Sequence, residues 1–225
     1  LVYLDSAATA QQPTSVVSAM VDFIQNDYAN THGRIHALSE RSQKHLDDGR
    51  ANVANFIGAK DSQDIVFTHS ATCGLNLVVN SYFASRLQAD DVVVTTILEH
   101  HSNFVPWQQL CQKTGAKLEV VPLVNHELDL EYLETILINK QPTVLAITHV
   151  SNVLGLENPL KEIIALAHKH GCLVVVDGAQ AVGHVEVDVV DLDCDFYVFS
   201  GHKMYAPTGI GVVYAKQELW PLMQP

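Results

Sequence analysis

Residues 144–177 read VLAITHVSNVLGLENPLKEIIALAHKHGCLVVVD, and this stretch decides the fold class. Its two apolar runs, 144–150 and 173–176, are rich in β-branched residues and mostly lack polar alternation, which is typical of strands covered on both faces. The segment between them, 158–170, has the spacing of an amphipathic helix. Because a helix that joins two parallel strands crosses over with the right hand, the stretch predicts one unit of a mainly parallel sheet.

The same stretch predicts where its helix begins and ends. Asn158 can cap the first turn, Pro159 suits the first helical position, and Gly171 can close the last turn. The apolar stripe that should face the sheet comprises Leu160, Ile163, Ile164 and Ala167.

Strands and helices continue to alternate on either side of this stretch. Further strands are predicted at 65–68, 92–97, 118–123, 196–199 and 211–214, and further helices at 14–26, 40–57, 74–88, 103–115 and 128–139. Only about eleven residues, rich in Gly and Pro, separate the last two strands, so the last strand is expected to be antiparallel to its neighbours. The sequence therefore predicts an α/β fold with a mainly parallel, seven-stranded sheet and helices on both faces.

Composition bounds the domain organisation and the class of partner. The 225 residues are 48% hydrophobic, and we expect residues 1–58 to form a helical segment packed on an α/β domain of residues 59–225. A net charge of −12 argues against nucleic acid. No apolar run approaches the ~20 residues of a membrane helix, and no signal peptide is evident. A reduced, cytoplasmic protein is indicated by four cysteines without CxxC spacing, Cys73, Cys111, Cys172 and Cys194.

Histidines are numerous, but their spacing does not predict a metal site. His32 and His36 form an HxxxH pair interrupted by Gly33, without the HExxH pattern of a zinc site. His100 and His101 are adjacent, and adjacent side chains point in different directions on most backbones. No metal is therefore expected.

Polar and titratable groups follow most of the predicted strands. In an open α/β sheet, ligands bind beyond the carboxyl ends of the strands, so these loops are expected to meet at one edge. The loops are HSATCG at 69–74, LEHHSN at 98–103, THVSN at 148–152, DGAQ at 177–180 and SGHK at 200–203.

Asp177 and Lys203 carry the most reactive groups in these loops, and each has two interpretations. Asp177 ends a buried strand, so its carboxylate either caps a loop through backbone N–H groups or pairs with a protonated pyridine nitrogen. Lys203 is either a solvated loop lysine or, beside Ser200 and His202, a desolvated amine that attacks an aldehyde.

Thr72 and His100 also have a structural and a functional interpretation. Thr72 lies at a predicted helix N-terminus, where backbone N–H groups favour an anion, although most such turns only cap their helix. His100 can stack on a flat heteroaromatic ring or simply bond to the backbone of its loop.

Several motifs in this order resemble one family, the cysteine desulfurases of the class V aminotransferase group, which are fold-type-I pyridoxal 5'-phosphate enzymes. The resemblance covers essentially the whole chain and points to the selenocysteine-lyase-like branch. It rests on LDSAAT at 4–9, EHHSNFVPW at 99–107, THVSNVLG at 148–155, DGAQ at 177–180, LDCDFYVFSGHK at 192–203 and SGHKMYAPTGIG at 200–211.

The resemblance implies a role for each matching residue. Lys203 would bind the cofactor covalently, Asp177 would pair with its pyridine nitrogen, and His100 would stack on its ring and move protons. Gln180 would contact the phenolic oxygen, and Asn152 would lie near the substrate carboxylate. The phosphate would be held by Thr72, Ser200 and His202, with Ala71 and Cys73 beside it.

The resemblance also implies a reaction and its partners. Sulfur would be removed from L-cysteine, leaving alanine and a persulfide on an enzyme cysteine, with selenocysteine as an alternative substrate. A homodimer, a protein that accepts the sulfur, and a link to iron–sulfur cluster assembly are expected.

Some positions depart from the family pattern. Ala71 and Cys73 replace a common Thr and a common acidic residue, Ala206 replaces a Gly, and THGRIH at 31–36 differs in the place of its Arg. The family continues into a smaller C-terminal domain that bears the persulfide cysteine and a substrate-binding arginine. This sequence ends at Pro225, and none of its cysteines matches that nucleophile, so we expect a fragment of the enzyme.

Three alternatives remain at this point. Another class V enzyme, such as a kynureninase-like or serine-type aminotransferase, would share these motifs. A non-catalytic binding module would keep the fold without the chemistry. A nicotinamide-binding domain would need a GxGxxG turn after its first strand, which is missing.

Overall fold

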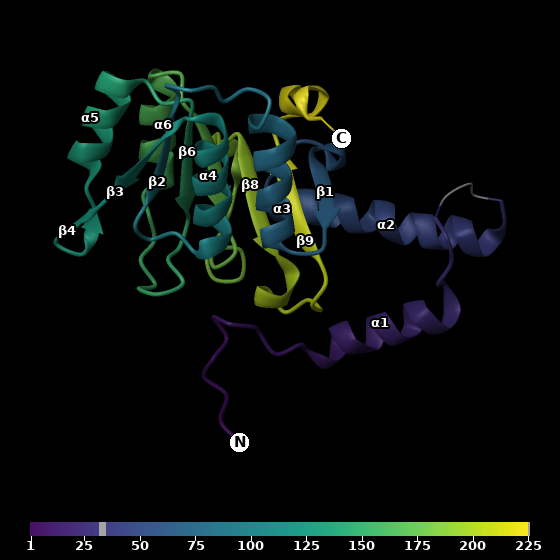
Figure 1. Cartoon of the computed structure of the whole chain (residues 1–225). Coiled ribbons are helices and arrows are strands. Elements are labelled where there is room, and N and C mark those ends of the chain that lie inside the picture. Colours follow the sequence, from purple (N-terminus) through teal and green to yellow (C-terminus); the bar gives the residue numbers. More distant parts are fainter. Residues whose placement is uncertain (32–34, 225) are drawn as a thin grey trace.

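A computed structural model describes residues 1–31 and 35–224 of the chain. Its central feature is a seven-stranded sheet with the order β1-β9-β8-β7-β6-β2-β3, drawn in Figure 1. The strands are β1 (Ile65–Thr68), β2 (Val92–Thr96), β3 (Lys117–Val121), β6 (Val144–Thr148), β7 (Leu173–Asp177), β8 (Phe196–Ser200) and β9 (Gly211–Ala215). All neighbours are parallel except β9, which is antiparallel to both β1 and β8. The predicted sheet and its antiparallel last strand are confirmed.

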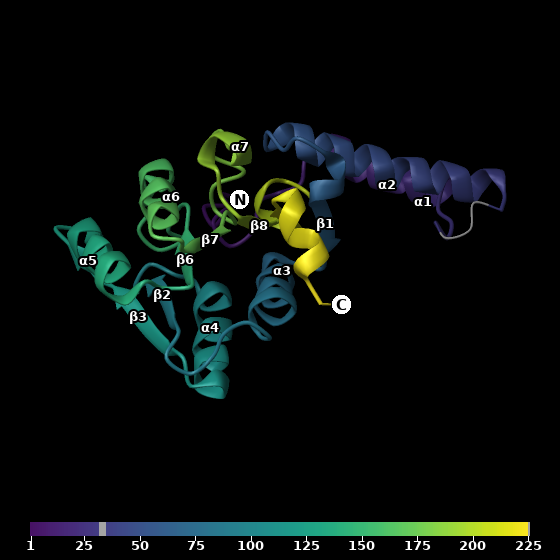
Figure 2. The ribbon, with the colours of Figure 1, turned by 90° about the horizontal axis from the view of Figure 1, so that it is seen from above.

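Helices cover both faces of this sheet. Seen from above in Figure 2, α5 (Leu130–Lys140), α6 (Leu160–Lys169) and α7 (Val189–Leu192) lie on one side, and α3 (Ala71–Val78) and α4 (His101–Thr114) lie on the other. Every residue of β2, β6, β8 and β9 is buried between these layers. Burying this much apolar surface is the main stabilising contribution to such a fold.

Short segments complete the helical layers. α3 continues directly into one π-helical turn, η2 (Val79–Phe83), so the helix predicted at 74–88 begins earlier and ends earlier. Short 3₁₀ segments precede β1, follow β8 and follow β9, at η1 (Ser62–Asp64), η3 (Gly201–Lys203) and η4 (Gln217–Leu222).

The start of α6 differs from the prediction. Asn158 does not cap the helix, because its buried side-chain amide donates to the carbonyl oxygen of Thr148 at 2.7 Å. Pro159 occupies the N-cap position and supplies no side-chain bond. At the other end Gly171 has a φ of 72°, as the prediction required. The predicted stripe on α6 is buried.

A small hairpin was missed. β4 (Leu123–Val124) and β5 (Glu127–Leu128) pair through a two-residue turn, in which Asn125 and His126 both have positive φ. Such a turn favours Asn and Gly, and His at the second position gave no signal.

The first two helices attach to the domain unequally. α2 (Ala37–Phe56) buries Ala54 in the core beside Ile57, whereas α1 (Thr14–Asn26) has no buried residue and lies apart from the sheet in Figure 1. α1 is held to α2 through Asp27, which contacts Arg41 at 3.0 Å and His45 at 2.8 Å. Within residues 1–58, α2 therefore contributes to the core and α1 does not.

The described residues allow two further statements. No helix among them is long and apolar enough to cross a membrane. No group of three or more His, Cys, Asp or Glu side chains within 1–31 and 35–224 could hold a metal ion. His32 and Gly33 of the HxxxH segment, and Arg34 of THGRIH, lie outside the described residues.

Candidate active site

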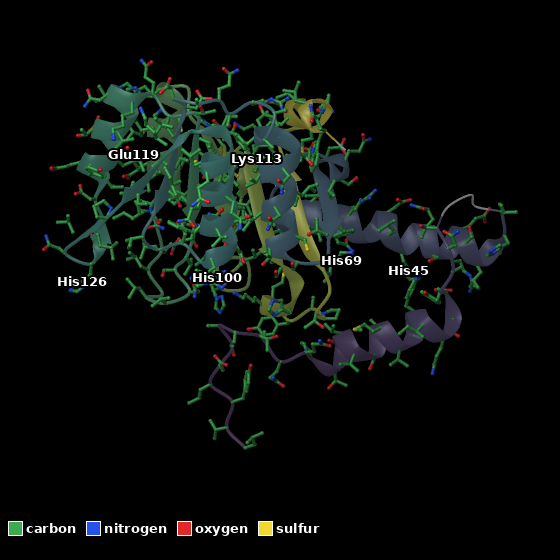
Figure 3. The ribbon with its side chains drawn as sticks, viewed as in Figure 1. His45, His69, His100, Lys113, Glu119 and His126 are labelled. Carbon is green, nitrogen blue, oxygen red and sulfur yellow. The ribbon has the colours of Figure 1, made fainter. Side chains whose placement is uncertain are left out.

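A cavity of about 500 Å³ lies at the carboxyl ends of the parallel strands. Figure 3 shows His100 at this edge of the sheet, at the opposite end of α4 from Lys113. The cavity brings together every expected site residue except Cys73, namely Ala71, Thr72, His100, Asn152, Asp177, Gln180, Ser200, His202 and Lys203. These residues come from five different strand-end loops, as the parallel topology dictates.

Asp177 is the last residue of β7 and is only 4% exposed. Its Oδ1 atom accepts a hydrogen bond from the backbone N–H of Ala179 at 2.9 Å, so it does cap its loop. Burial raises the pKa of the carboxyl group, while the Ala179 N–H and the charges of Lys203 and His100 lower it. A buried carboxylate that also lines a cavity can stabilise a cation bound there.

Lys203 ends the 3₁₀ turn after β8 and is half-buried. Burial lowers the pKa of its amine below the usual value, against the opposing effect of the Asp177 charge. An amine with a lowered pKa is more often unprotonated and therefore more nucleophilic.

Hydroxyl groups and backbone N–H groups gather at the N-terminus of α3. Ser70 caps the helix by accepting from the N–H of Cys73 at 3.1 Å, and Ser200 accepts from the N–H of Ala71 at 2.7 Å. The Thr72 hydroxyl lies 2.7 Å from that of Ser102. A helix N-terminus with hydroxyl groups beside it is a favourable place for an anion such as phosphate.

The approach of α3 to the sheet depends on a glycine. A Cβ atom at Gly211, the first residue of β9, would lie 2.3 Å from the carbonyl carbon of Ser70. No larger residue fits at this position without moving the backbone, so Gly211 lets the α3 N-terminus sit beside the turn that carries Lys203.

His100 caps α4 as well as lining the cavity. Its Nδ1 atom accepts a hydrogen bond from the backbone N–H of Ser102 at 3.1 Å, so in the neutral ring the proton is on Nε2. The structural interpretation of His100 therefore holds, and it leaves Nε2–H for a ligand.

The N-terminal segment covers part of the cavity. Gln180 donates from Nε2 to the carbonyl oxygen of Ala7 at 2.7 Å, and the His202 ring lies 3.1 Å from the Thr9 hydroxyl. The N–H of Ala10 donates to the carbonyl oxygen of His202 at 2.8 Å. These bonds fasten the segment over the loops that hold Gln180 and Lys203.

Cys73 is the one expected site residue that the cavity does not include. It lies exposed on α3 and does not line the cavity, since one helical step beyond Thr72 turns its side chain away. Sequence reasoning also missed cavity-lining residues, of which Ser70 and Ser102 lie in the quoted loops and carry the same hydroxyl signal as Thr72. The others are Asp5, Ala7, Ala8, Thr148, Val150 and Ala179.

Comparison with known proteins places this site in a family. The sequence profile of the family "Aminotransferase class-V" matches residues 2–225. Proteins named cysteine desulfurase from Shigella sonnei and Escherichia coli are 51% identical over 226 residues, covering 100% of this chain and 55% of theirs. The chain thus spans about half the length of these relatives.

Solved structures agree with the sequence comparison. A cysteine desulfurase from Escherichia coli, in an S-sulfonic acid form, has a TM-score of 0.90 at 42% identity, covering 99% of this chain and 56% of the other. The apo structure of a cysteine desulfurase from Thermococcus onnurineus NA1 has a TM-score of 0.94 at 39% identity, covering 100% of this chain and 56% of the other. The resemblance to the cysteine desulfurases of class V is confirmed, and the chain belongs to the aminotransferase class-V family.

Proposed function

We propose that this chain carries the pyridoxal 5'-phosphate-binding part of a cysteine desulfurase. The observation that carries the proposal is the convergence of Asp177, Lys203 and His100 on one cavity that ends at the N-terminus of α3. The cavity offers a buried carboxylate, a nucleophilic amine and an anion-binding end, which match the pyridine nitrogen, aldehyde and phosphate of this cofactor. The identity of 51% to cysteine desulfurases over the whole chain supports the reaction class.

Each end of the cofactor has a proposed set of residues. Lys203 would hold the aldehyde carbon covalently, and Asp177 would pair with the pyridine nitrogen. His100 would lie over the ring, and Gln180 would turn from Ala7 toward the phenolic oxygen. The phosphate would bind Thr72, Ser200 and His202 at the N-terminus of α3.

The chemistry divides between the cofactor and the protein. When bound, pyridoxal phosphate supplies an electron sink that makes protons and leaving groups beside the substrate amine labile. Asp177, kept ionised by a cation at the pyridine nitrogen, would stabilise that sink. Lys203, with its lowered pKa, would take and return a proton at the substrate α-carbon. His100 would donate from Nε2, since Nδ1 is occupied by Ser102.

The substrate and partners follow from the same proposal. L-cysteine would give alanine, with its sulfur passed to a thiol and then to an acceptor protein, and selenocysteine is the alternative substrate. No described cysteine lines the cavity, so we propose that the receiving thiol comes from outside residues 1–31 and 35–224. A homodimer and a cytoplasmic location, in keeping with four unpaired thiols, complete the proposal.

Reductive labelling tests the cofactor site. Pyridoxal phosphate added to the folded chain should give a visible absorption band that borohydride bleaches, and peptide mapping should place the label on Lys203. Lys203→Ala should lose the label. Lys113→Ala, at the far end of α4, should keep it. A label spread over surface lysines and unchanged in Lys203→Ala would refute the site.

A second experiment tests the reaction. The full-length gene product, with cofactor and a reductant, should release alanine and sulfide from L-cysteine in equal amounts. Residues 1–225 alone should bind cofactor but release far less, because a positioned thiol is missing. Release of a keto acid in place of alanine would favour an aminotransferase of the same family. Comparable rates from both chains would mean that one of the four cysteines here receives the sulfur.

A further inference from the structure

Glu99 precedes His100 and was not among the expected site residues. Its carboxyl group accepts three hydrogen bonds: at Oε1 from the Thr96 hydroxyl at 2.7 Å and the Thr148 N–H at 2.9 Å, and at Oε2 from the Asn103 side-chain amide at 2.6 Å. Thr96 ends β2, Thr148 ends β6, and Asn103 is in the first turn of α4. One carboxyl group therefore joins three elements at the edge where the cavity lies.

The direction of the bond between Asn103 and Glu99 is fixed by a donor farther along α4. The indole Nε1–H of Trp107 can only donate, and it donates to Asn103 Oδ1 at 3.3 Å. This orients the Asn103 amide, so that its NH₂ group faces Glu99. Asn103 and Trp107 are both fully buried, which leaves no water to replace a lost partner. Glu99 Oε2 must therefore accept from Asn103, and Oε1 must accept from the Thr148 N–H, which can only donate.

Glu99 links two parts of the cavity wall, the loops that follow the neighbouring strands β2 and β6. On one side, Asn103 donates its backbone N–H to the carbonyl oxygen of His100 at 2.8 Å. On the other, the Thr148 side chain lines the cavity and donates to the carbonyl oxygen of Val150 at 3.0 Å, in the loop that leads to Asn152. We propose that Glu99, through Asn103 and Thr148, is a positioning residue that fixes His100 relative to the 148–152 wall of the cavity.

Electrostatics agrees with a specialised role for this group. Burial of the carboxyl raises its pKa to about 8, although the bonds from Thr96, Asn103 and Thr148 lower it and the charge of Asp177 raises it further. Protonation need not break the network. The Thr96 hydroxyl also accepts from the Leu98 N–H at 3.1 Å, and it can reverse its bond to Glu99 by rotating. The Asn103 and Thr148 bonds persist in either state.

The fixed donors and acceptors allow a test in which the carboxyl group of Glu99 and the amide group of Asn103 are exchanged. In Glu99→Gln, the new NH₂ group faces either the Asn103 NH₂ group or the Thr148 N–H, and both are donors. In the double variant Glu99→Gln/Asn103→Asp, the amide donates to the new carboxylate, whose other oxygen still accepts from Trp107. The double variant keeps one carboxyl group, one amide group and the number of hydrogen bonds, so it should restore what the single variant loses.

Two readouts separate positioning from general stability. Hydrogen exchange of the Thr148 amide, followed by NMR without cofactor, should speed up on the order of tenfold or more in Glu99→Gln. With pyridoxal phosphate added, the induced circular dichroism of its visible band should weaken and its dissociation constant should rise on the order of tenfold. Both should return to near wild-type values in the double variant.

Asp64→Asn is the matched control. Asp64 is also a buried carboxylate with a raised pKa, but it precedes β1, at the end of that strand far from the cavity. Its substitution should change the free energy of unfolding without changing either readout.

If Glu99→Gln left both readouts at wild-type values, or if the folded double variant failed to restore them, the proposal would be wrong. The inference rests on the proposed function only in giving His100 a role at the cofactor. A wild-type chain that binds no cofactor would therefore refute that function. Hydrogen exchange of the Thr148 amide would still test the positioning role of Glu99.

Discussion

The Ser200 hydroxyl accepts a hydrogen bond at 2.7 Å from the backbone N–H of Ala71, which is 129 residues away in the chain. Ser200 ends β8, directly before the turn that carries Lys203, and Ala71 begins α3. The first N–H groups of a helix have no partner within the helix, so this bond satisfies one of them from across the site. The lysine turn and the anion-binding helix are thereby held together before any ligand binds.

Removing this bond should destabilise the folded chain. Ser200→Ala would leave the Ala71 N–H without an acceptor at a residue only 6% exposed, so the free energy of unfolding should fall by about 1–3 kcal/mol. Urea unfolding of the cofactor-free chain measures the loss. Ser85→Ala, at an exposed position, is the control and should change stability by less than ~0.5 kcal/mol. Equal losses in the two variants would contradict the importance of the Ser200 bond.

Gly178 provides a steric prediction beside Asp177. A Cβ atom there would lie 2.0 Å from the Tyr197 ring, which is fully buried and fixed by a 2.8 Å bond between its hydroxyl and His149 Nδ1. Gly178→Ala should therefore lower the free energy of unfolding by about 1–3 kcal/mol through overpacking. Thermal unfolding with matched urea curves measures this change.

Gly49 offers the matched control for that substitution. It lies within α2, where a new Cβ would meet nothing closer than 3.9 Å. Because alanine favours a helix over glycine, Gly49→Ala should raise stability by about 0.5–1 kcal/mol. A Gly178→Ala protein as stable as wild type would show that the Tyr197 ring can move.

The sequence predicted best those site residues that lie at the ends of strands. Asp177 ends β7 and Lys203 lies in the turn after the neighbouring parallel strand β8. Because parallel strands bring their carboxyl ends to the same edge, position in the chain was enough to predict that the two residues lie close together. The motif DGAQ followed by SGHK then predicted the cofactor, because these motifs resemble those of the cysteine desulfurases. The deviation at Cys73 has a local cause, because a helix rotates each successive side chain away from the last.

Contacts between distant segments could not be predicted in this way. Glu99 owes its role to Thr148, 49 residues away, and to an amide whose orientation Trp107 sets. Asn158 has the sequence pattern of a helix cap, yet its side-chain amide donates to the carbonyl oxygen of Thr148 at the end of β6. In both cases tertiary hydrogen bonds override the local preference, and no single-segment pattern encodes them.

Thiol reactivity should separate Cys73 from the other cysteines. Cys73 is exposed, whereas Cys111, Cys172 and Cys194 are buried, and burial raises the pKa of the Cys172 thiol to about 12. Since the thiolate is the reactive form, iodoacetamide at pH 8 should label Cys73 first in the folded chain. Mass spectrometry of peptides locates the label, and all four should react in denaturant. Fast labelling of Cys172 without unfolding would contradict the buried strand entrance at which it lies.

Lys216 should stabilise the fold over a defined pH range. Its amine lies 2.7 Å from Asp193 and 3.2 Å from Asp195, beside His168, which contacts both carboxylates. Burial lowers the pKa of Lys216, but the bonds and charges of the two aspartates outweigh it and raise the pKa above 10.5. Burial likewise raises the pKa of Asp193, but Lys216 and His168 outweigh it and hold it below 3.8.

The signs of these shifts fix the pH dependence. The stability gained from the raised pKa of Lys216 is present below pH 10.5 and is lost as the pH rises through the folded-state pKa. The stability gained from the lowered pKa of Asp193 is present above pH 3.8 and is lost as the pH falls through the folded-state pKa. Lys216→Met should therefore cost about 1–2 kcal/mol, a moderate figure because Asp193 is exposed although Asp195 is buried. That cost should be equal at pH 5, 7 and 9 and smaller at pH 3.5.

Lys161→Met is the control. It breaks an exposed pair with Asp191 and should cost less than ~0.5 kcal/mol. Urea unfolding across this series is the measurement, and a cost that vanished between pH 5 and 9 would assign the stabilisation to a group that titrates in that range.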